Sequence, residues 1–220
     1  NEHHSLGLFP KALRQELERD DSVIVMGEDI AGGGTRPDKQ DAWGGPMRLT
    51  KGLIGQFGPE RIRDTPISEA GFVGAGVGAA AAGLRPVVDL MYVGFFGVCA
   101  DQIINNAAKI HYMFGGKVTI PLTIMTGTGA GTNSAAQHSE TLYSIFTHFP
   151  GLKCVVPSNP YNVKGLFMAA IRDEDPVIIF NNRQLMGFRG EPHVPEEPYT
   201  LEIGKADIPR EGSDITLVGI

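Results

Sequence analysis

Apolar positions along the chain alternate between two spacings. Short continuous apolar runs predict buried strands at residues 23–26, 86–91, 121–125, 153–156 and 177–180. Apolar residues at three- and four-residue intervals predict helices at 9–19, 47–57, 95–113, 140–148 and 158–172. Strands that alternate with helices in this way predict an α/β fold, a parallel sheet with helices on both faces.

The segment DTPISEAGF, residues 64–72, has the most unusual local pattern. We interpret it as a turn that delivers one carboxylate, Glu69, directly before the small-residue run GFVGAGVGAAAAGL. This pattern predicts that Glu69 points into a cleft and that the following helix packs closely against another backbone. A surface glutamate at the start of a helix fits the same position.

The glycines at 74, 76 and 78 resemble a dinucleotide-binding fingerprint only superficially. That motif requires an apolar strand immediately before it and a helix N-terminus that faces a phosphate. Here the preceding residues are polar and acidic, and Glu69 would repel a diphosphate. Close helix packing is the better explanation of these glycines.

Two long loops are expected. Gly, Pro and Asp dominate residues 31–46, which contain Trp43, and Gly, Ser, Thr and Asn dominate residues 126–136. Long loops in compact domains are often functional, although a mobile surface loop fits residues 31–46 equally well. Sites in parallel sheets gather at the carboxyl ends of strands, where we expect His138 to lie.

Composition narrows the class of protein. The 220 residues suffice for one large α/β domain, and the net charge of −6 argues against nucleic acid or an anionic membrane as the main partner. The longest apolar run is too short to span a bilayer. Cys99 and Cys154 are expected to be free thiols in a reducing compartment, so we expect a cytoplasmic protein. His3 and His4 lack further ligands at zinc spacing.

The pattern predicts three segments along the chain. Residues 5–185 form the main domain, residues 186–203 with Pro192, Pro195 and Pro198 form a linker, and 204–220 form the first strand of a second domain that the chain truncates.

Several motifs occur in a fixed order along residues 8–220. They are GEDI, DTPISEAGF, GAAAAGLRPV, DQIINNAAK, YMFGG, AAQHSE, PGLKCVVPS and KGLFMAAIRDEDPVIIF. Together they resemble the β subunit of the decarboxylating, thiamine-diphosphate-dependent component of 2-oxo acid dehydrogenase complexes. DAWGG, DLMYVGFFGVCADQI and TLYSIFTHFPGLK favour the acetoin dehydrogenase branch. The resemblance implies a pyrimidine-binding-type fold followed by a transketolase C-terminal-like domain.

The resemblance also implies roles for particular residues. Glu69 corresponds to the glutamate that activates thiamine diphosphate through its aminopyrimidine ring, and Phe95 to an aromatic residue that packs on that ring. His138 corresponds to the histidine that assists acyl transfer to a lipoyl group. Glu28 is a further candidate in the cleft.

In this family the cofactor lies between two subunits. The resemblance implies an α₂β₂ heterotetramer in which the α subunit holds Mg²⁺ and the diphosphate through a GDG motif, which this chain lacks. It also implies K⁺ bound by this chain, largely through backbone carbonyls. The matching positions are Leu122, Ala170, Ile171, Asp173 and Asp175.

The implied activity is cleavage of a C–C bond next to a carbonyl, with transfer of the fragment to the lipoamide of an acyltransferase. Met125 stands where relatives commonly carry Arg, which favours a neutral substrate such as acetoin over a charged 2-oxo acid. A pyruvate or branched-chain 2-oxo acid dehydrogenase β subunit is the alternative among enzymes. A non-catalytic assembly module is the alternative from another class.

Overall fold

One parallel sheet organises the chain. The structure, a computed structural model, describes residues 5–31, 44–131, 133–185 and 193–219. Within these residues six strands pair in the order β2-β1-β3-β4-β6-β5, and all five pairings are parallel. The strands are β1 (Val23–Glu28), β2 (Ile62–Thr65), β3 (Arg85–Tyr92), β4 (Thr123–Thr128), β5 (Lys153–Val155) and β6 (Val177–Asn182). The α/β fold predicted from the apolar runs is confirmed.

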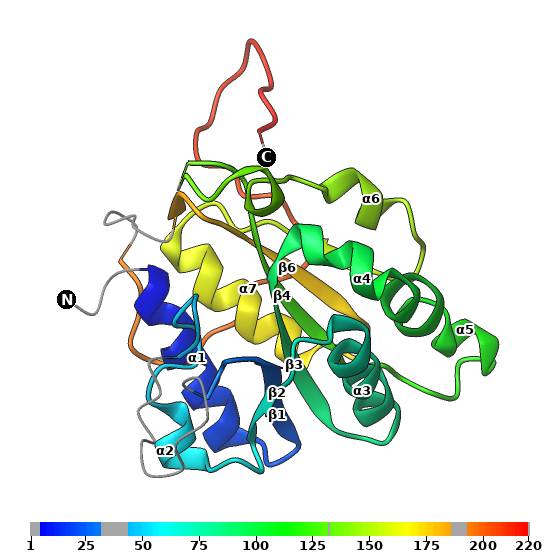
Figure 1. Cartoon of the computed structure of the whole chain (residues 1–220). Coiled ribbons are helices and arrows are strands. Elements are labelled where there is room, and N and C mark those ends of the chain that lie inside the picture. The colour runs from blue at the N-terminus through cyan, green and yellow to red at the C-terminus, as the bar shows by residue number, and fades with distance from the viewer. Residues whose placement is uncertain (1–4, 32–43, 132, 186–192, 220) are drawn as a thin grey trace.

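Helices cover both faces of the sheet (Figure 1). They are α1 (Ser5–Arg19), α2 (Leu53–Phe57), α3 (Glu69–Ala81), α4 (Phe96–Asp101), α5 (Ile110–Met113), α6 (Tyr143–Thr147) and α7 (Pro160–Arg172). Short η segments, η1 (Val93–Phe95), η2 (Gln102–Ala107) and η3 (Ala136–His138), complete the connections.

Successive side chains of the strands enter two separate hydrophobic cores. In β1, Val23 and Val25 pack in a core with α1, α2 and α7, whereas Ile24 and Met26 pack in a second core with α3, α4 and η2. This alternation follows from the two-residue period of a strand. The sheet is therefore buried on both sides, as the near-continuous apolar strands require.

Helix α7 begins where the sequence predicts. The Asn159 side chain accepts a hydrogen bond from the Asn162 amide at 2.8 Å, and Pro160 occupies the first turn. Asn at the N-cap followed by Pro satisfies an amide that has no partner inside the helix.

Three expectations about local structure were wrong. Residues 64–65 are not part of a turn but end β2. This strand contains the exposed residues Arg63 and Asp64, so it has no continuous apolar run that would predict it. Only 53–57 of the expected helix 47–57 is helical. The expected helix 95–113 is divided into η1, α4, the π-helical η2 and α5, and α4 is itself kinked at Cys99, whose torsion angles of −117° and 15° are non-helical.

The small residues of α3 bring that helix close to the sheet. A Cβ atom at Gly76 would lie 2.8 Å from Val88 Cγ2 and 3.3 Å from Leu122 Cδ1. The close packing predicted for this helix is therefore confirmed at Gly76, and the helix is fixed by the side chains of β3 and of the residue before β4.

A buried lysine fastens the segment after the main domain to α7. Lys164 is fully buried, and its Nζ donates hydrogen bonds to the carbonyls of Pro195, Glu196 and Glu197 at 2.7, 3.1 and 2.8 Å. Tyr199 adds a hydrogen bond to the Tyr161 carbonyl at 2.7 Å and stacks on its ring. The described part of the linker thus follows the surface of α7 closely.

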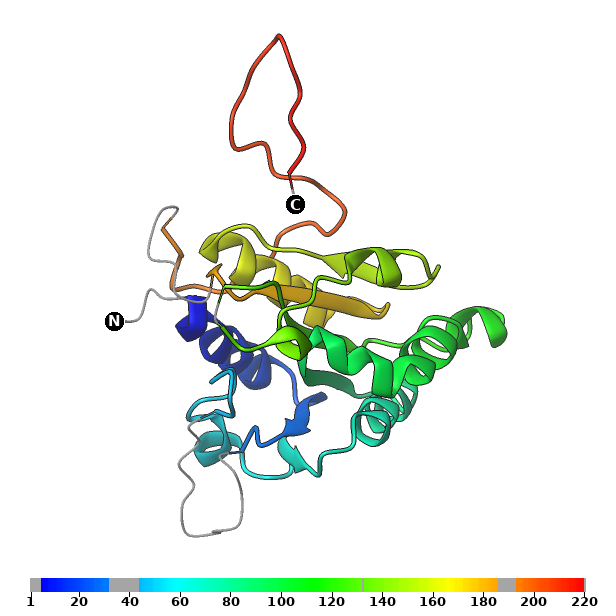
Figure 2. The same ribbon diagram turned by 45° about the horizontal axis from the view of Figure 1, so that its top comes forward.

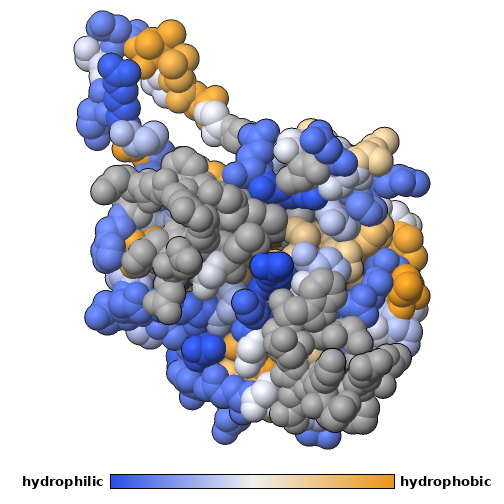
Figure 3. Space-filling model, turned by 60° about the vertical axis from the view of Figure 1, so that its left-hand side comes forward, coloured by the Kyte–Doolittle hydropathy of each residue, from blue (hydrophilic) through white to orange (hydrophobic). Residues whose placement is uncertain are grey.

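Residues 204–219 extend away from the main domain (Figure 2) and carry apolar surface (Figure 3). The strand expected in this segment does not form: Ile215, Leu217 and Val218 are at least 75% exposed. An isolated segment has no neighbouring strand to supply the hydrogen bonds of a sheet. That this segment belongs to a second domain stays a prediction.

Among the residues that the structure describes, no helix is both long and apolar enough to cross a membrane.

Candidate active site

The strand order predicts a ligand-binding crevice at the carboxyl ends of β1 and β3. The chain runs from β1 to β2 on one side and then returns, through α3, to β3 on the other side of β1. Ligands of open parallel sheets bind where the strand order reverses in this way. Glu28 ends β1, Tyr92 ends β3, and Glu69 begins α3.

Glu69 is a buried carboxylate without a donor. It is 7% exposed at the first position of α3, where the helix dipole favours a negative charge. No described residue donates a hydrogen bond to its carboxylate. The carboxylate is thus free to accept a hydrogen bond from a ligand or from water. The alternative of a surface glutamate is thus excluded by its burial.

Two further carboxyl groups belong to this region: Glu28 lies near Glu69, and Asp89 lies near Glu28. Burial raises the pKa of the half-buried Glu28, and the charges of Asp29 and Glu69 raise it further. Burial also raises the pKa of Asp89 to about 6, against the hydrogen bond from the Met91 amide, and the charge of Glu28 adds to the rise. Three acidic groups therefore share one edge of the sheet, where they favour a ligand that donates hydrogen bonds.

Aromatic rings form the other wall of the site. The imidazole of His138 stacks on Tyr92 with ring centroids 4.0 Å apart and an interplanar angle of 9°. Phe95 meets both rings edge-on, at 5.6 Å from His138 and 5.7 Å from Tyr92. Phe95 and His138, which the sequence suggested separately, are thus in direct contact, and both are partly exposed.

Arg183 anchors the loop that contains Ser134 and His138. Its guanidinium donates to the His138 carbonyl at 2.5 Å and to Ser134 Oγ at 2.8 Å, and its carbon lies 5.0 Å from the centroid of the Tyr92 ring. These contacts tie the loop after β4 to the end of β6. Arg183 Nε and His138 Nδ1 are buried and have no hydrogen-bond partner among the residues that the structure describes.

Asp89→Asn is expected to flatten the dependence of the unfolding free energy on pH. The pKa of Asp89 is about 6 in the fold against an ordinary 3.8, so the folded chain binds this proton more tightly. Its contribution to stability is therefore fully present below the ordinary pKa and is lost as the pH rises through the folded value, a loss of about 3 kcal/mol.

Urea unfolding at a series of pH values measures this effect, and the difference between Asp89→Asn and the parent chain isolates the one carboxyl. If the plots of unfolding free energy against pH run parallel for the two proteins from about pH 4 to about pH 7, the raised pKa of Asp89 is contradicted.

The five positions suggested for K⁺ already accept protein donors. The Leu122 and Ala170 carbonyls accept backbone amides from Val177 and Asp173. Arg85 donates to the carbonyls of Ile171 and Asp173 at 3.2 and 3.0 Å, and Lys153 Nζ lies 2.8 Å from both Asp173 carboxylate oxygens and 3.0 Å from an oxygen of Asp175. An oxygen at each of these positions thus already has a protein donor, and the K⁺ site stays a prediction that rests on the resemblance.

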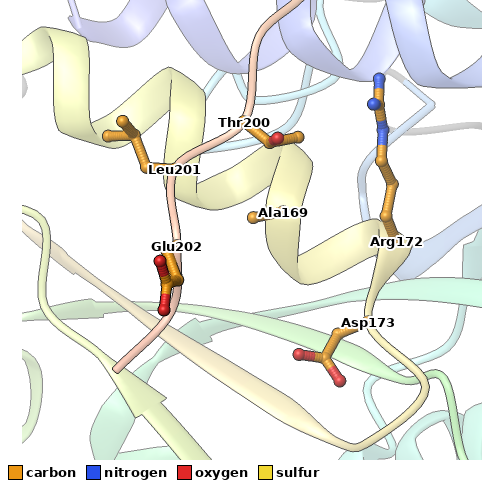
Figure 4. A pocket seen from close by; sticks show the side chains of 6 residues that line it. All are labelled: Ala169, Arg172, Asp173, Thr200, Leu201 and Glu202. Atoms are coloured by element: carbon orange, nitrogen blue, oxygen red, sulfur yellow. The ribbon is translucent and has the colours of Figure 1, made fainter. Parts of the chain in front are cut away.

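A cavity of about 510 Å³ lies beside these positions and far in sequence from Glu69. It is lined by Ala169, Arg172, Asp173, Thr200, Leu201 and Glu202 (Figure 4). Arg172 and Asp173 form ion pairs with Glu16 and Lys153, so these two charged groups already have partners. No described group of three His, Cys, Asp or Glu side chains could hold a metal ion.

Several other expectations have definite outcomes. Both cysteines are free, and Cys99 is buried whereas Cys154 is half-buried. Met125 is 1% exposed in the core beneath α1 and α7, so it gives no support to a neutral substrate. Trp43, His3 and His4 lie outside the described residues.

Sequence reasoning missed Asp89, Tyr92 and Arg183. Asp89 carried a usable signal, because a charged residue inside the apolar run VVDLM must be buried with the strand. Tyr92 and Arg183 gave none, since a strand-end tyrosine and a loop arginine are ordinary surface residues in sequence.

The parallel sheet with helices on both faces, together with Glu69 at the carboxyl ends of β1 and β3, defines a class of protein. This class is the cofactor-binding α/β domains of the transketolase type. The chain belongs to the family "Transketolase, pyrimidine binding domain", whose model matches residues 6–188. Membership implies thiamine diphosphate as the cofactor. The prediction of a pyrimidine-binding-type fold is confirmed.

Curated relatives narrow the family further. The chain is 52% identical over 212 residues to the acetoin:2,6-dichlorophenolindophenol oxidoreductase subunit beta of Bacillus subtilis (strain 168), which covers 96% of this chain and 61% of that protein. It is 42% identical over 208 residues to the 2-oxoisovalerate dehydrogenase subunit beta of the same organism, covering 94% and 60%.

It is also 44% identical over 207 residues to the pyruvate dehydrogenase E1 component subunit beta of Rickettsia felis (strain ATCC VR-1525 / URRWXCal2), covering 94% and 60%. The chain thus spans about three fifths of the length of these relatives. A solved structure titled "Split gene transketolase, inactive beta4 tetramer" matches with a TM-score of 0.66 and 18% identity, covering 89% of this chain and 56% of that one, which shows the shared fold.

Proposed function

We propose that this chain is the pyrimidine-binding part of the β subunit of a thiamine-diphosphate-dependent acetoin dehydrogenase. The observation that carries the proposal is Glu69, a buried carboxylate without a donor at the crevice between β1 and β3. Acetoin is preferred to pyruvate or a branched-chain 2-oxo acid because identity is 52% to the acetoin relatives and 42–44% to the others cited above.

The residues of the crevice fit the cofactor. Thiamine diphosphate, when bound, supplies the carbon nucleophile that attacks a carbonyl and makes the adjacent C–C bond cleavable. Glu69 offers the acceptor that a protonated ring nitrogen of the aminopyrimidine requires, and burial strengthens that hydrogen bond. Phe95 and Tyr92 offer apolar surface beside it.

His138 is the candidate for proton transfer. Its ring is held between Tyr92 and Phe95, and its loop is tied down by Arg183, so the imidazole is positioned before any substrate arrives. A fixed imidazole at the mouth of the crevice can hold or deliver a proton to a substrate oxygen. Glu28, half-buried beside Glu69, is proposed to line the same crevice.

The rest of the assembly follows the relatives, which are named beta subunits. We propose an α subunit as the partner in an α₂β₂ assembly, with Mg²⁺ and the diphosphate held by α, and a lipoyl-bearing acyltransferase as the acceptor of the fragment. The acidic crevice supports this division, because Glu28, Glu69 and Asp89 disfavour a diphosphate on this side.

Calorimetric titration of thiamine diphosphate with Mg²⁺ tests the proposal. Binding is expected only when the chain is combined with a GDG-containing α subunit, since each chain carries half of the site. Tight binding by this chain alone would contradict the shared site, and binding by neither combination would favour a non-catalytic assembly module. Turnover of acetoin, pyruvate and branched-chain 2-oxo acids by the combined subunits then decides the substrate.

A further inference from the structure

The end of β3 contains a strained residue next to the His138 site. Met91 has a φ of 62°, a left-handed conformation that is unfavourable for a residue with a side chain. The pairing of β3 with β4 shifts at the same place: Asp89 pairs with Met125, whereas Tyr92 pairs with Gly127. Three steps along β3 thus match two along β4, which is a β-bulge.

The Asp89 carboxylate fixes this bulge. Asp89 Oδ1 accepts a hydrogen bond from the Met91 amide at 2.9 Å, and the side chain is 4% exposed. Two glycines make room for the irregular backbone. A Cβ atom at Gly127 would lie 3.0 Å from the Met91 carbonyl oxygen, and one at Gly27 would lie 2.9 Å from the Asp89 carbonyl oxygen.

The bulge sets the direction of the next side chain. An extra residue in a strand reverses the face to which the following side chains point. Tyr92 follows Met91 directly, and its ring lies flat on the His138 imidazole at 4.0 Å. The Arg183 guanidinium contacts the same tyrosine ring, so Tyr92 is the common surface on which the site is assembled.

We propose that Asp89 is a positioning residue: it holds Met91 in the left-handed conformation, and the resulting bulge places Tyr92 against His138. The importance of this arrangement for turnover rests on the proposed function, but the arrangement itself is a property of this chain. The competing explanation is that the stack with His138 holds Tyr92 in place and that the bulge follows.

Nuclear magnetic resonance of the full chain with ¹³C-labelled histidine tests the proposal. A stacked tyrosine ring shifts the His138 Hε1 signal upfield, and the signal is assigned by its loss in His138→Gln. Asp89→Ala is expected to abolish the upfield shift and to speed hydrogen exchange of the Met91 amide roughly tenfold or more. Asp89→Asn keeps an acceptor oxygen and is expected to retain both properties.

Met91→Gly provides the decisive rescue, because glycine adopts a positive φ without a steric penalty. Asp89→Ala/Met91→Gly is expected to fold and to regain the upfield shift. If Asp89→Ala alone does not fold, the double variant decides: its failure to fold or to regain the shift would overturn the proposal. An unchanged shift in folded Asp89→Ala would overturn it too. Failure of the proposed function would leave all of these signals unaffected.

Discussion

Glu69→Gln is expected to reduce the turnover of the proposed αβ enzyme by roughly 10²–10⁴-fold, the range for loss of a positioned acid–base group. Glutamine has nearly the same size as glutamate, so the start of α3 and its packing are expected to stay intact. It lacks the negative charge that makes a buried acceptor strong. Steady-state turnover with saturating thiamine diphosphate and Mg²⁺ measures the effect, and circular dichroism confirms the fold.

Glu28→Gln is the matched control, since Glu28 is a carboxylate in the same crevice but is half-buried. We expect it to lose less than about tenfold in turnover. Activity of Glu69→Gln within tenfold of the parent enzyme would remove Glu69 from its proposed role. Equal losses in the two variants would show that total charge in the crevice matters, and not one acceptor.

Arg172→Met is expected to lower the free energy of unfolding by about 3 kcal/mol. The Glu16 side chain is 0% exposed, and Arg172 donates to both of its oxygens, at 2.6–3.1 Å. This pair joins α1 to α7 on one face of the sheet. Without Arg172 the buried carboxylate retains only the bond from Arg19 at 2.8 Å, which leaves a buried charge poorly compensated.

Urea unfolding measures the change, with Arg19→Met as the control. Arg19 is 40% exposed and makes one bond to Glu16, so we expect a loss of about 1 kcal/mol. Glu16→Leu combined with Arg172→Met is expected to restore most of the stability, because an apolar pair needs no desolvated charge. Equal losses for the two arginines would mean that burial of Glu16 is not the cause.

The sheet could be predicted from the sequence because its central strands are apolar on both faces. The runs at 23–26, 86–91 and 177–180 all lie within observed strands. The start of α7 was equally readable, since Asn159 and Pro160 act through their own backbone neighbours. Local chemistry of this kind depends little on the rest of the fold.

Features that depend on distant contacts were not predictable. The strand β2 is recognisable only from its pairing with β1, since Arg63 and Asp64 make it look like a loop. The bulge at Met91 arises from a carboxylate two residues earlier and from glycines on two neighbouring strands. The contact between Phe95 and His138 joins residues 43 positions apart, for which the sequence has no signal.

The edge position of β2 has a consequence for how the crevice loses its structure. This four-residue strand has a single ladder, to β1, and it leads through residues 66–68 directly to Glu69. Edge strands with one short ladder open at lower free energy than central strands. Partial unfolding that begins at β2 would therefore release Glu69 while β3, β4 and β6 stay paired. Glu69 is thus connected to β2, one of the least cooperative parts of the sheet. A subunit packed against β2 would therefore stabilise the position of Glu69 without contacting it.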